Sequence, residues 1–177
     1  MNMENLKQII SEKAIKQRVE EIAKEISATF EGEVPILVSV LNGSFIFASD
    51  LLRALKVDCE IDFIKVSTYS GNKSKGTIDF QKDISAEISN RHVIIVEDII
   101  DSGLTVKFIR ERFINFKPKS ITIATLLMKP DVAKIDFEVN WVGFEIPPDY
   151  VVGYGLDYNQ KFRNLRGIYI LGGNNYE

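Results

Sequence analysis

Cysteine and histidine are almost absent from this sequence. Its 177 residues include one cysteine, Cys59, and one histidine, His92. A single cysteine excludes an intramolecular disulfide, and the two residues are too few for a zinc site or a Cys-His catalytic pair. Cys59 stands in the strand-like stretch VDCEIDF, where we expect a small core residue rather than a nucleophile.

Long apolar runs and basic clusters are also missing. No stretch approaches the ~18 apolar residues that a membrane helix needs, and the N-terminus lacks the apolar core of a signal peptide. The net charge is −3, and Lys and Arg form no block of the kind that phosphate contacts to nucleic acid require. The 45% hydrophobic and 27% charged fractions are ordinary for a globular protein. We therefore expect one domain over residues 1–177, located in the cytoplasm.

Strand and helix patterns alternate along the chain. Ser11 is the predicted N-cap of a helix that runs to about Ala28. Further helices are predicted over 44–55, with Ser44 near the cap, and over 104–116, with an inward face of Leu104, Phe108, Ile109, Phe113 and Phe116. Strands are predicted over 35–41, 60–69, 92–97, 120–128, 139–146, 150–156 and 167–171, and 70–77 is predicted to be a loop. Strands without polar alternation are typical of parallel strands covered on both faces, so we expect an α/β fold with an open, largely parallel central sheet flanked by helices.

Ligands of such sheets bind beyond the carboxyl ends of the strands. The most informative end is VIIVEDIIDSGLT. Ser102 and Gly103 permit a tight turn before a helix, whose first N–H groups could hold a phosphate monoester together with the Ser102 and Thr105 hydroxyls; an ordinary helix cap is the alternative. Two adjacent carboxylates, Glu97 and Asp98, would suit a sugar diol with magnesium, and Asp101 could accept a proton from a ligand base. A solvated acidic loop is the alternative here.

The same stretch closely resembles the phosphoribosyl pyrophosphate signature of type I phosphoribosyltransferases, in the form of the hypoxanthine-guanine enzymes. The resemblance continues through VLNGSFIFASDLL, STYSG, LLMKP and VGFEIPPDYVVGYGLDYNQKFRNL. It implies transfer of a 5-phosphoribosyl group to N9 of hypoxanthine or guanine, with magnesium as cofactor and IMP or GMP and pyrophosphate as products. It also implies a homodimer or homotetramer, and a small hood built from the N-terminal segment and about 145–177.

The resemblance also implies a role for individual residues. Glu97 and Asp98 would engage the ribose hydroxyls and magnesium, and Asp101 would manage the proton at purine N7. The 5'-phosphate would lie in the loop formed by Asp101, Ser102, Gly103, Leu104 and Thr105. Leu104 stands where some relatives have Lys, and we expect its side chain to pack while the backbone binds.

The purine would meet a second group of residues. Lys129 would donate to purine O6, since an ammonium has donors only and leaves the amine of adenine unpaired. Tyr150 would stack on the base, the Val151 backbone would meet its edge, and Asp157 would contact magnesium and the base region. Without the resemblance, Lys129 would be a strand-end lysine and the Tyr-Val pair a piece of core.

Pyrophosphate would lie against Asn42, Gly43 and Arg163, whose planar guanidinium suits bidentate oxyanion binding. Many relatives have Lys in place of Asn42, so this contact could be backbone only; the family often has a non-proline cis peptide here. Thr68 and Tyr69 would begin a mobile lid over about 68–80.

Two other classes remain open at this point. A non-catalytic regulator on the same fold would sense phosphoribosyl pyrophosphate and bind RNA or DNA, and it would need a basic face or a further domain. A receiver-type signalling domain also places acids and magnesium at strand ends, but it leaves GYGLDYNQKFR unexplained.

Overall fold

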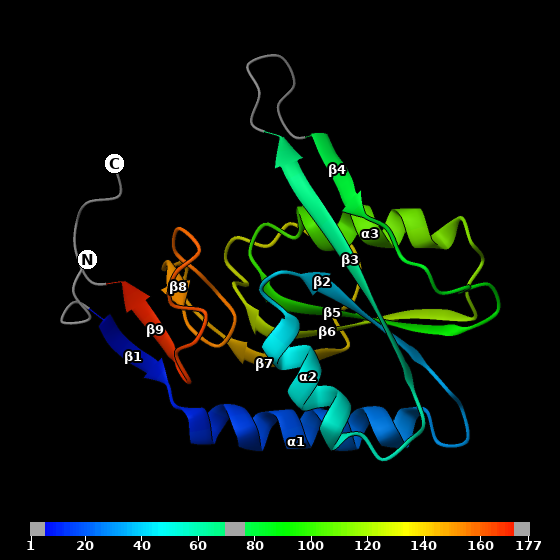
Figure 1. The fold of residues 1–177 in the computed structure, drawn as a ribbon, viewed down its shortest axis with the longest axis horizontal. Helices are drawn as coiled ribbons and strands as arrows, with labels where there is room; N and C mark the ends of the chain where they lie inside the picture. Colours follow the sequence, from blue (N-terminus) through cyan, green and yellow to red (C-terminus); the bar gives the residue numbers. More distant parts are fainter. Residues whose placement is uncertain (1–5, 70–76, 172–177) are drawn as a thin grey trace.

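The computed structural model describes residues 6–69 and 77–171, and its centre is a six-stranded sheet (Figure 1). The strands lie in the order β4-β3-β2-β5-β6-β7, all parallel except β4, which runs antiparallel to β3. Their bounds are β2 Ile36–Leu41, β3 Glu60–Tyr69, β4 Thr77–Lys82, β5 His92–Ile100, β6 Ser120–Met128 and β7 Trp141–Glu145. The predicted open, largely parallel α/β sheet is confirmed.

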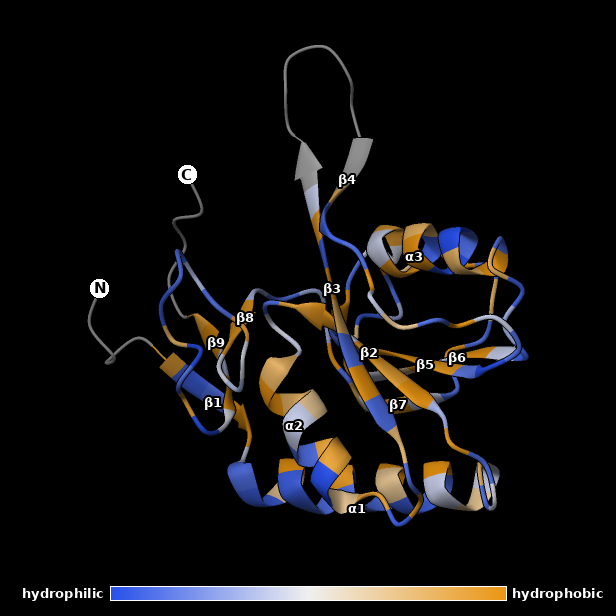
Figure 2. Cartoon of the chain, turned by 45° about the vertical axis from the view of Figure 1, so that its right-hand side comes forward, coloured by the Kyte–Doolittle hydropathy of each residue, from blue (hydrophilic) through white to orange (hydrophobic). Residues whose placement is uncertain are grey.

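Helices cover the two faces of this sheet. Helices α1 (Glu12–Thr29) and α2 (Phe45–Ala54) lie on one face, and α3 (Leu104–Ile114) lies on the other (Figure 1). Neighbouring residues of β2 take part in different cores: Leu37 packs with the α1 and α2 side, whereas Ile36 and Val38 pack with the α3 side. Burial on both faces explains why the central strands are mostly apolar, as the orange colouring along β2 and β5 in Figure 2 illustrates.

The first helix agrees closely with its prediction. Ser11 is the N-cap of α1, and its hydroxyl accepts from the backbone N–H of Ala14 at 3.2 Å. The buried residues of α1 are the predicted face, Ile15, Val19, Ile22, Ala23 and Ile26. Ser44 is different, because its side chain makes no capping hydrogen bond to α2 and instead donates to the Val40 carbonyl and contacts Ser39.

The predicted inward face of α3 is partly wrong. Leu104 is 57% exposed and Phe116 is 41% exposed, whereas the buried residues are Val106, Ile109 and Phe113. Leu104 lies two residues before Val106, about 200° away around the helix. Phe116 lies beyond the end of α3, where the helical spacing no longer applies.

A second sheet joins the two ends of the described chain. Its order is β1-β9-β8, formed by β1 (Leu6–Ile10), β9 (Ile168–Leu171) and β8 (Val151–Val152), with Leu6 paired to Leu171. The sequence did not predict β1, and the strand predicted over 150–156 is reduced to β8. Positive φ angles at Gly153, Tyr154 and Gly155 turn the backbone out of the extended conformation.

The sequence also missed β4. Thr68 pairs with Ile78 and Tyr69 with Thr77, so the described ends of the predicted lid are two paired strands. The rest of the predicted loop, 70–76, and the side chains of Thr68 and Tyr69 lie outside the described residues. Within the described ranges, no helix is long and apolar enough to cross a membrane.

Candidate active site

The predicted site residues come from strand ends that share one edge of the central sheet. Parallel strands β2, β5 and β6 end side by side, and their ends carry Asn42 and Gly43, then Glu97, Asp98 and Asp101, then Lys129. The segment after β8 adds Asp157 and Arg163 from the other sheet. The fold therefore gathers groups that are up to 121 residues apart in the chain.

Glu97 and Asp98 are the most perturbed acids of this edge. Glu97 is 6% exposed, and its Oε2 has no hydrogen-bond partner among the described residues. Burial, and secondarily the Asp98 charge, raise the pKa of Glu97 well above its ordinary value. Burial also raises the pKa of Asp98 to about 6, although the N–H of Ile99 and the charge of Arg163 oppose the shift. A buried acid with an unpaired oxygen favours a cation or a hydroxyl group as its partner.

The loop after β2 lies directly against Asp98. A Cβ atom added to Gly43 would stand 1.6 Å from Oδ2 of Asp98, so no other residue fits at this position without movement. The preceding Leu41–Asn42 peptide bond is cis. The backbone of the predicted pyrophosphate loop and the predicted ribose carboxylate are thus in contact.

The predicted phosphate loop forms the start of α3. Gly103 is the N-cap, with φ +82° in the left-handed region, and an added Cβ would lie 2.3 Å from Cγ2 of Ile135. The Ser102 hydroxyl accepts from the N–H of Leu104 at 3.5 Å, and the Ser102 carbonyl accepts from the backbone N–H of Lys134. The first-turn N–H groups of a helix have no partner within it, so this end is suited to an anion. The expected packing of Leu104 is wrong, since its side chain is exposed.

Lys129 and Asp101 form an ion pair that the sequence did not predict. Nζ of Lys129 donates to Oδ2 of Asp101 at 2.8 Å, with the lysine side chain 8% exposed and the aspartate 54% exposed. The backbone N–H of Lys129 also donates to the Ile100 carbonyl at 2.9 Å, which joins the ends of β5 and β6. A positive donor and a negative acceptor are therefore presented next to each other.

A second ion pair lies in the segment after β8. Arg163 contacts Oδ1 of Asp157 at 2.8 Å and donates to the Gly155 carbonyl at 2.7 Å. The Tyr150 hydroxyl donates to the Asp157 carbonyl at 2.9 Å, and the Tyr150 ring is 42% exposed. Val151 is buried, and it pairs with Ile170 in the second sheet.

The predicted magnesium ligands are not a preformed cage. Across residues 6–69 and 77–171, no three His, Cys, Asp or Glu side chains gather closely enough to hold a metal. Magnesium in nucleotide sites usually keeps waters and binds one or two carboxylates together with substrate oxygens. The acidic oxygens of Glu97 and Asp98, one of them unpaired, fit that mode.

Comparison with known proteins decides the family. Residues 5–159 match the phosphoribosyl transferase domain. The hypoxanthine-guanine phosphoribosyltransferase of Aquifex aeolicus is 42% identical over 168 residues, which cover 94% of each chain. This chain belongs to the hypoxanthine-guanine phosphoribosyltransferase family. The resemblance expected from its motifs is confirmed.

Solved structures of this phosphoribosyltransferase family have the same fold. The enzyme of Bacillus anthracis, crystallised with a HEPES molecule in its active site, superimposes with a TM-score of 0.88 and 44% identity, covering 93% of this chain and 97% of that one. The hypoxanthine phosphoribosyltransferase of Trypanosoma cruzi, solved with its product IMP, gives a TM-score of 0.89 at 35% identity, covering 97% of each. The type I phosphoribosyltransferase fold is thereby confirmed for this chain.

Proposed function

We propose that this chain transfers the 5-phosphoribosyl group from phosphoribosyl pyrophosphate to N9 of hypoxanthine or guanine, with IMP or GMP and pyrophosphate as products. Relatives with this name match nearly the whole chain. The geometry of the described residues supports a role for each group of side chains in this reaction.

The Lys129–Asp101 ion pair is the observation that carries the choice of base. A 6-oxopurine presents an acceptor at O6 next to N7 on one edge, whereas adenine presents an amine donor in place of O6. The ammonium of Lys129 has three donors, so it can bind Asp101 and O6 together. Asp101 then stands next to N7, where it takes up or returns the proton as N9 forms its new bond. Adenine would place its amine donor against the donors of Lys129, which disfavours it.

The Glu97–Asp98 pair supports the ribose part of the proposal. Glu97 is buried and Asp98 is partly buried, which disfavours the charge of both acids, and ribose hydroxyls would give Glu97 the partner it lacks. Positive charge that develops on the ribose ring in the transition state is stabilised by carboxylates fixed nearby. Glu97, Asp98 and Asp157 would share the binding of magnesium with substrate oxygens, with one or two carboxylates to an ion, and the bound metal would supply charge neutralisation for the pyrophosphate leaving group.

The 5'-phosphate and the pyrophosphate of the substrate would bind to separate parts of the site. The first turn of α3 and the Ser102 and Thr105 hydroxyls would hold the 5'-phosphate, with Leu104 contributing its backbone N–H. Pyrophosphate would lie against the backbone of Asn42 and Gly43, with Arg163 exchanging its contact to Asp157 for a phosphate oxygen.

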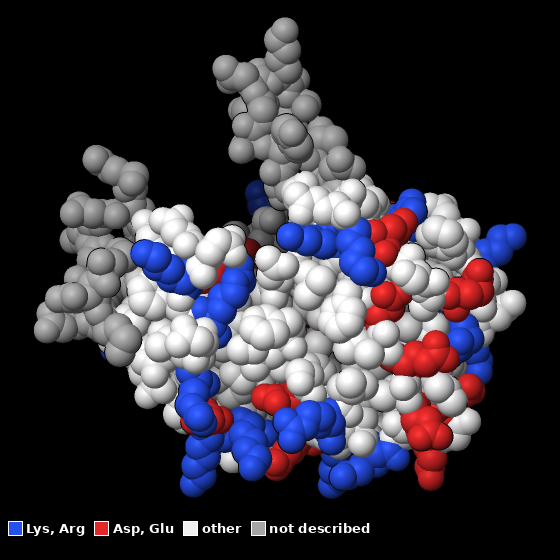
Figure 3. Space-filling model, in the orientation of Figure 1, with Lys and Arg blue, Asp and Glu red and all other residues white. Residues whose placement is uncertain are grey.

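Purified protein tests the proposal directly. It is incubated with phosphoribosyl pyrophosphate, Mg²⁺ and hypoxanthine, guanine or adenine, and the nucleotides are separated by chromatography. We expect IMP and GMP but little AMP, and loss of product when EDTA removes the metal. If folded protein forms neither IMP nor GMP, the proposal fails. Binding of phosphoribosyl pyrophosphate without turnover would indicate the non-catalytic regulator instead. A regulator that binds RNA or DNA needs a basic face, whereas Lys and Arg are interspersed with Asp and Glu on the face in Figure 3.

Assembly and location stay predictions. We propose a homodimer or homotetramer in the cytoplasm, as the resemblance implies, which sedimentation and cell fractionation would test. The single-domain boundary, the lid over about 68–80 and the hood likewise stay predictions.

A further inference from the structure

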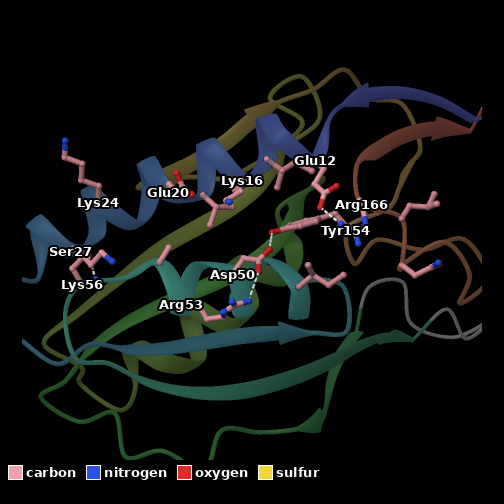
Figure 4. Close-up of a pocket in the computed structure, with 16 residues that line it drawn as sticks. Glu12, Lys16, Glu20, Lys24, Ser27, Asp50, Arg53, Lys56, Tyr154 and Arg166 are labelled. Atoms are coloured by element: carbon pink, nitrogen blue, oxygen red, sulfur yellow. Dashed lines mark hydrogen bonds and ion pairs between the residues drawn. The ribbon is translucent and has the colours of Figure 1, made fainter.

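Tyr154 lies between the proposed purine residues Val151 and Asp157, but its side chain reaches across to α2 (Figure 4). The residue is 7% exposed and belongs to the core on the α1 and α2 side of the sheet. Its hydroxyl donates to Oδ2 of Asp50 at 2.6 Å. Burial first, and then this hydrogen bond, raise the pKa of Tyr154, so the hydroxyl remains a protonated donor near neutral pH.

The next residue makes a second contact across the same boundary. Gly155 has φ +103°, and an added Cβ would lie 2.0 Å from the carbonyl oxygen of Gly43. The backbone after β8 is therefore pressed against the proposed pyrophosphate loop. The N–H groups of Tyr154 and Gly155 also donate to the carbonyls of Leu165 and Arg163, at 2.8 and 3.0 Å. Two consecutive residues thus connect α2, the pyrophosphate loop and the segment between β8 and β9 that carries Arg163.

Helix α2 connects Asp50 directly to the pyrophosphate loop. The helix begins at Phe45, two residues after Gly43, and Asp50 lies in its second turn. A helix moves as a rigid element over so short a span, so a group bound to Asp50 keeps its position relative to the loop before the helix.

We propose that Tyr154, through its hydrogen bond to Asp50, is a positioning residue that holds the purine-binding segment 150–157 in register with the pyrophosphate loop 42–43. The inference rests on the proposed function, in which one of these parts holds the purine and the other the leaving group. Their relative position sets how N9 faces C1', and small displacements of reacting atoms are costly to rate.

The test separates the hydroxyl from the ring. Tyr154→Phe keeps the packing and removes the donor, Asp50→Ala removes the acceptor, and Asp50→Asn retains an acceptor oxygen. Tyr169→Phe is the matched control, because within the described part of the chain that hydroxyl accepts a single long bond, of 3.4 Å, from Gln8 on the second sheet. Each variant is assayed for kcat and KM of IMP formation at saturating Mg²⁺, and its thermal unfolding is recorded.

We expect kcat to fall about tenfold in Tyr154→Phe, equivalent to about 1.4 kcal/mol, in protein that remains folded at the assay temperature. Asp50→Asn and Tyr169→Phe should keep wild-type kcat. The double variant Tyr154→Phe/Asp50→Ala should be no slower than the slower single variant, since both remove one interaction.

Two results would overturn the proposal: a kcat for Tyr154→Phe within about twofold of wild type, or single-variant losses that multiply in the double variant. Failure of the proposed function looks different, because then the wild-type protein itself forms no nucleotide.

Discussion

Gly43→Ala isolates the contact between the pyrophosphate loop and Asp98. The new Cβ would stand 1.6 Å from Oδ2 and 2.5 Å from Cγ of Asp98, whereas ordinary contacts of this kind begin near 3.4 Å. Either the loop or the carboxylate must therefore move by more than 1 Å. Gly43 is not among the glycines with positive φ, so the effect of the substitution is steric rather than conformational.

A displacement of this size at reacting groups lowers rates by about 100-fold. We expect Gly43→Ala to lower kcat/KM for phosphoribosyl pyrophosphate by about that factor, because both the ribose carboxylate and the pyrophosphate loop are affected. The measurement is initial-rate kinetics of IMP formation with phosphoribosyl pyrophosphate varied at saturating hypoxanthine and Mg²⁺. Circular dichroism of the same samples checks that the variant is folded.

Gly32→Ala is the matched control, with the opposite properties. Gly32 has φ +77° and nothing within 4 Å of an added Cβ, and it lies in the turn after α1. Left-handed backbone costs an alanine about 1–2 kcal/mol, which lowers the melting temperature by about 2–8 °C without changing kcat/KM. If Gly43→Ala retains kcat/KM within about threefold of wild type, the contact with Asp98 does not position the substrate and the reasoning is refuted.

Three further predictions concern other side chains. Lys129→Met should lower kcat/KM for hypoxanthine by about 100-fold, since it removes a charged donor, and should narrow the preference over adenine in competition assays; an unchanged base preference would contradict the role of Lys129. Asp101→Asn should lower kcat by about 100-fold or more while the Kd for substrates, measured by calorimetry, changes little; comparable kcat would remove Asp101 from the proton step. Asp62→Ala should destabilise the fold by about 2 kcal/mol, because the carboxylate accepts from the N–H groups of Phe63, Ser85 and Ala86 and from Lys82. These bonds outweigh burial and lower the pKa of Asp62, so its stabilisation is present above the unfolded-state pKa and is lost as pH falls through the folded-state pKa. Urea unfolding measured from pH 7 down into the acid range would show a variant deficit that shrinks as pH falls, and an equal deficit at every pH would contradict it.

The sequence predicted the parts of the fold that hydrophobic burial determines. Strands such as β5 and β6 are buried on both faces, and α1 is buried along one face, so the hydrophobic pattern of the sequence predicted these elements. The strands β1 (LKQII) and β4 (TIDFQK) were missed because polar residues interrupt each of them, and each pairs at a sheet edge, where the partner strand rather than the pattern decides the conformation. The pairing of β1 with β9 also joins residues more than 150 positions apart, which local sequence does not encode.

The site was predicted as a set of residue types at strand ends, but not as a set of contacts. Gly43 and Gly155 were visible as glycines, yet their mutual approach depends on how the second sheet docks on the first. The GYG spacing around Tyr154 was the available signal for a turn with positive φ. Leu104 was misplaced for a local reason, because the phase of α3 is set by Val106, Ile109 and Phe113.

The ion pairs of the site explain how so much charge is kept at one sheet edge. Lys129 compensates Asp101 and Arg163 compensates Asp157, at 2.8 Å in each case, so four of the charged groups stabilise one another. Glu97 lacks such a partner within the described chain, and burial raises its pKa. A ligand that supplied hydroxyls and a cation at Glu97 would gain more there than at the paired groups, because it would relieve an unsatisfied buried acid. In the proposed function, the sugar and its metal would therefore relieve the unsatisfied acid at Glu97, while the Lys129–Asp101 pair would discriminate between the bases.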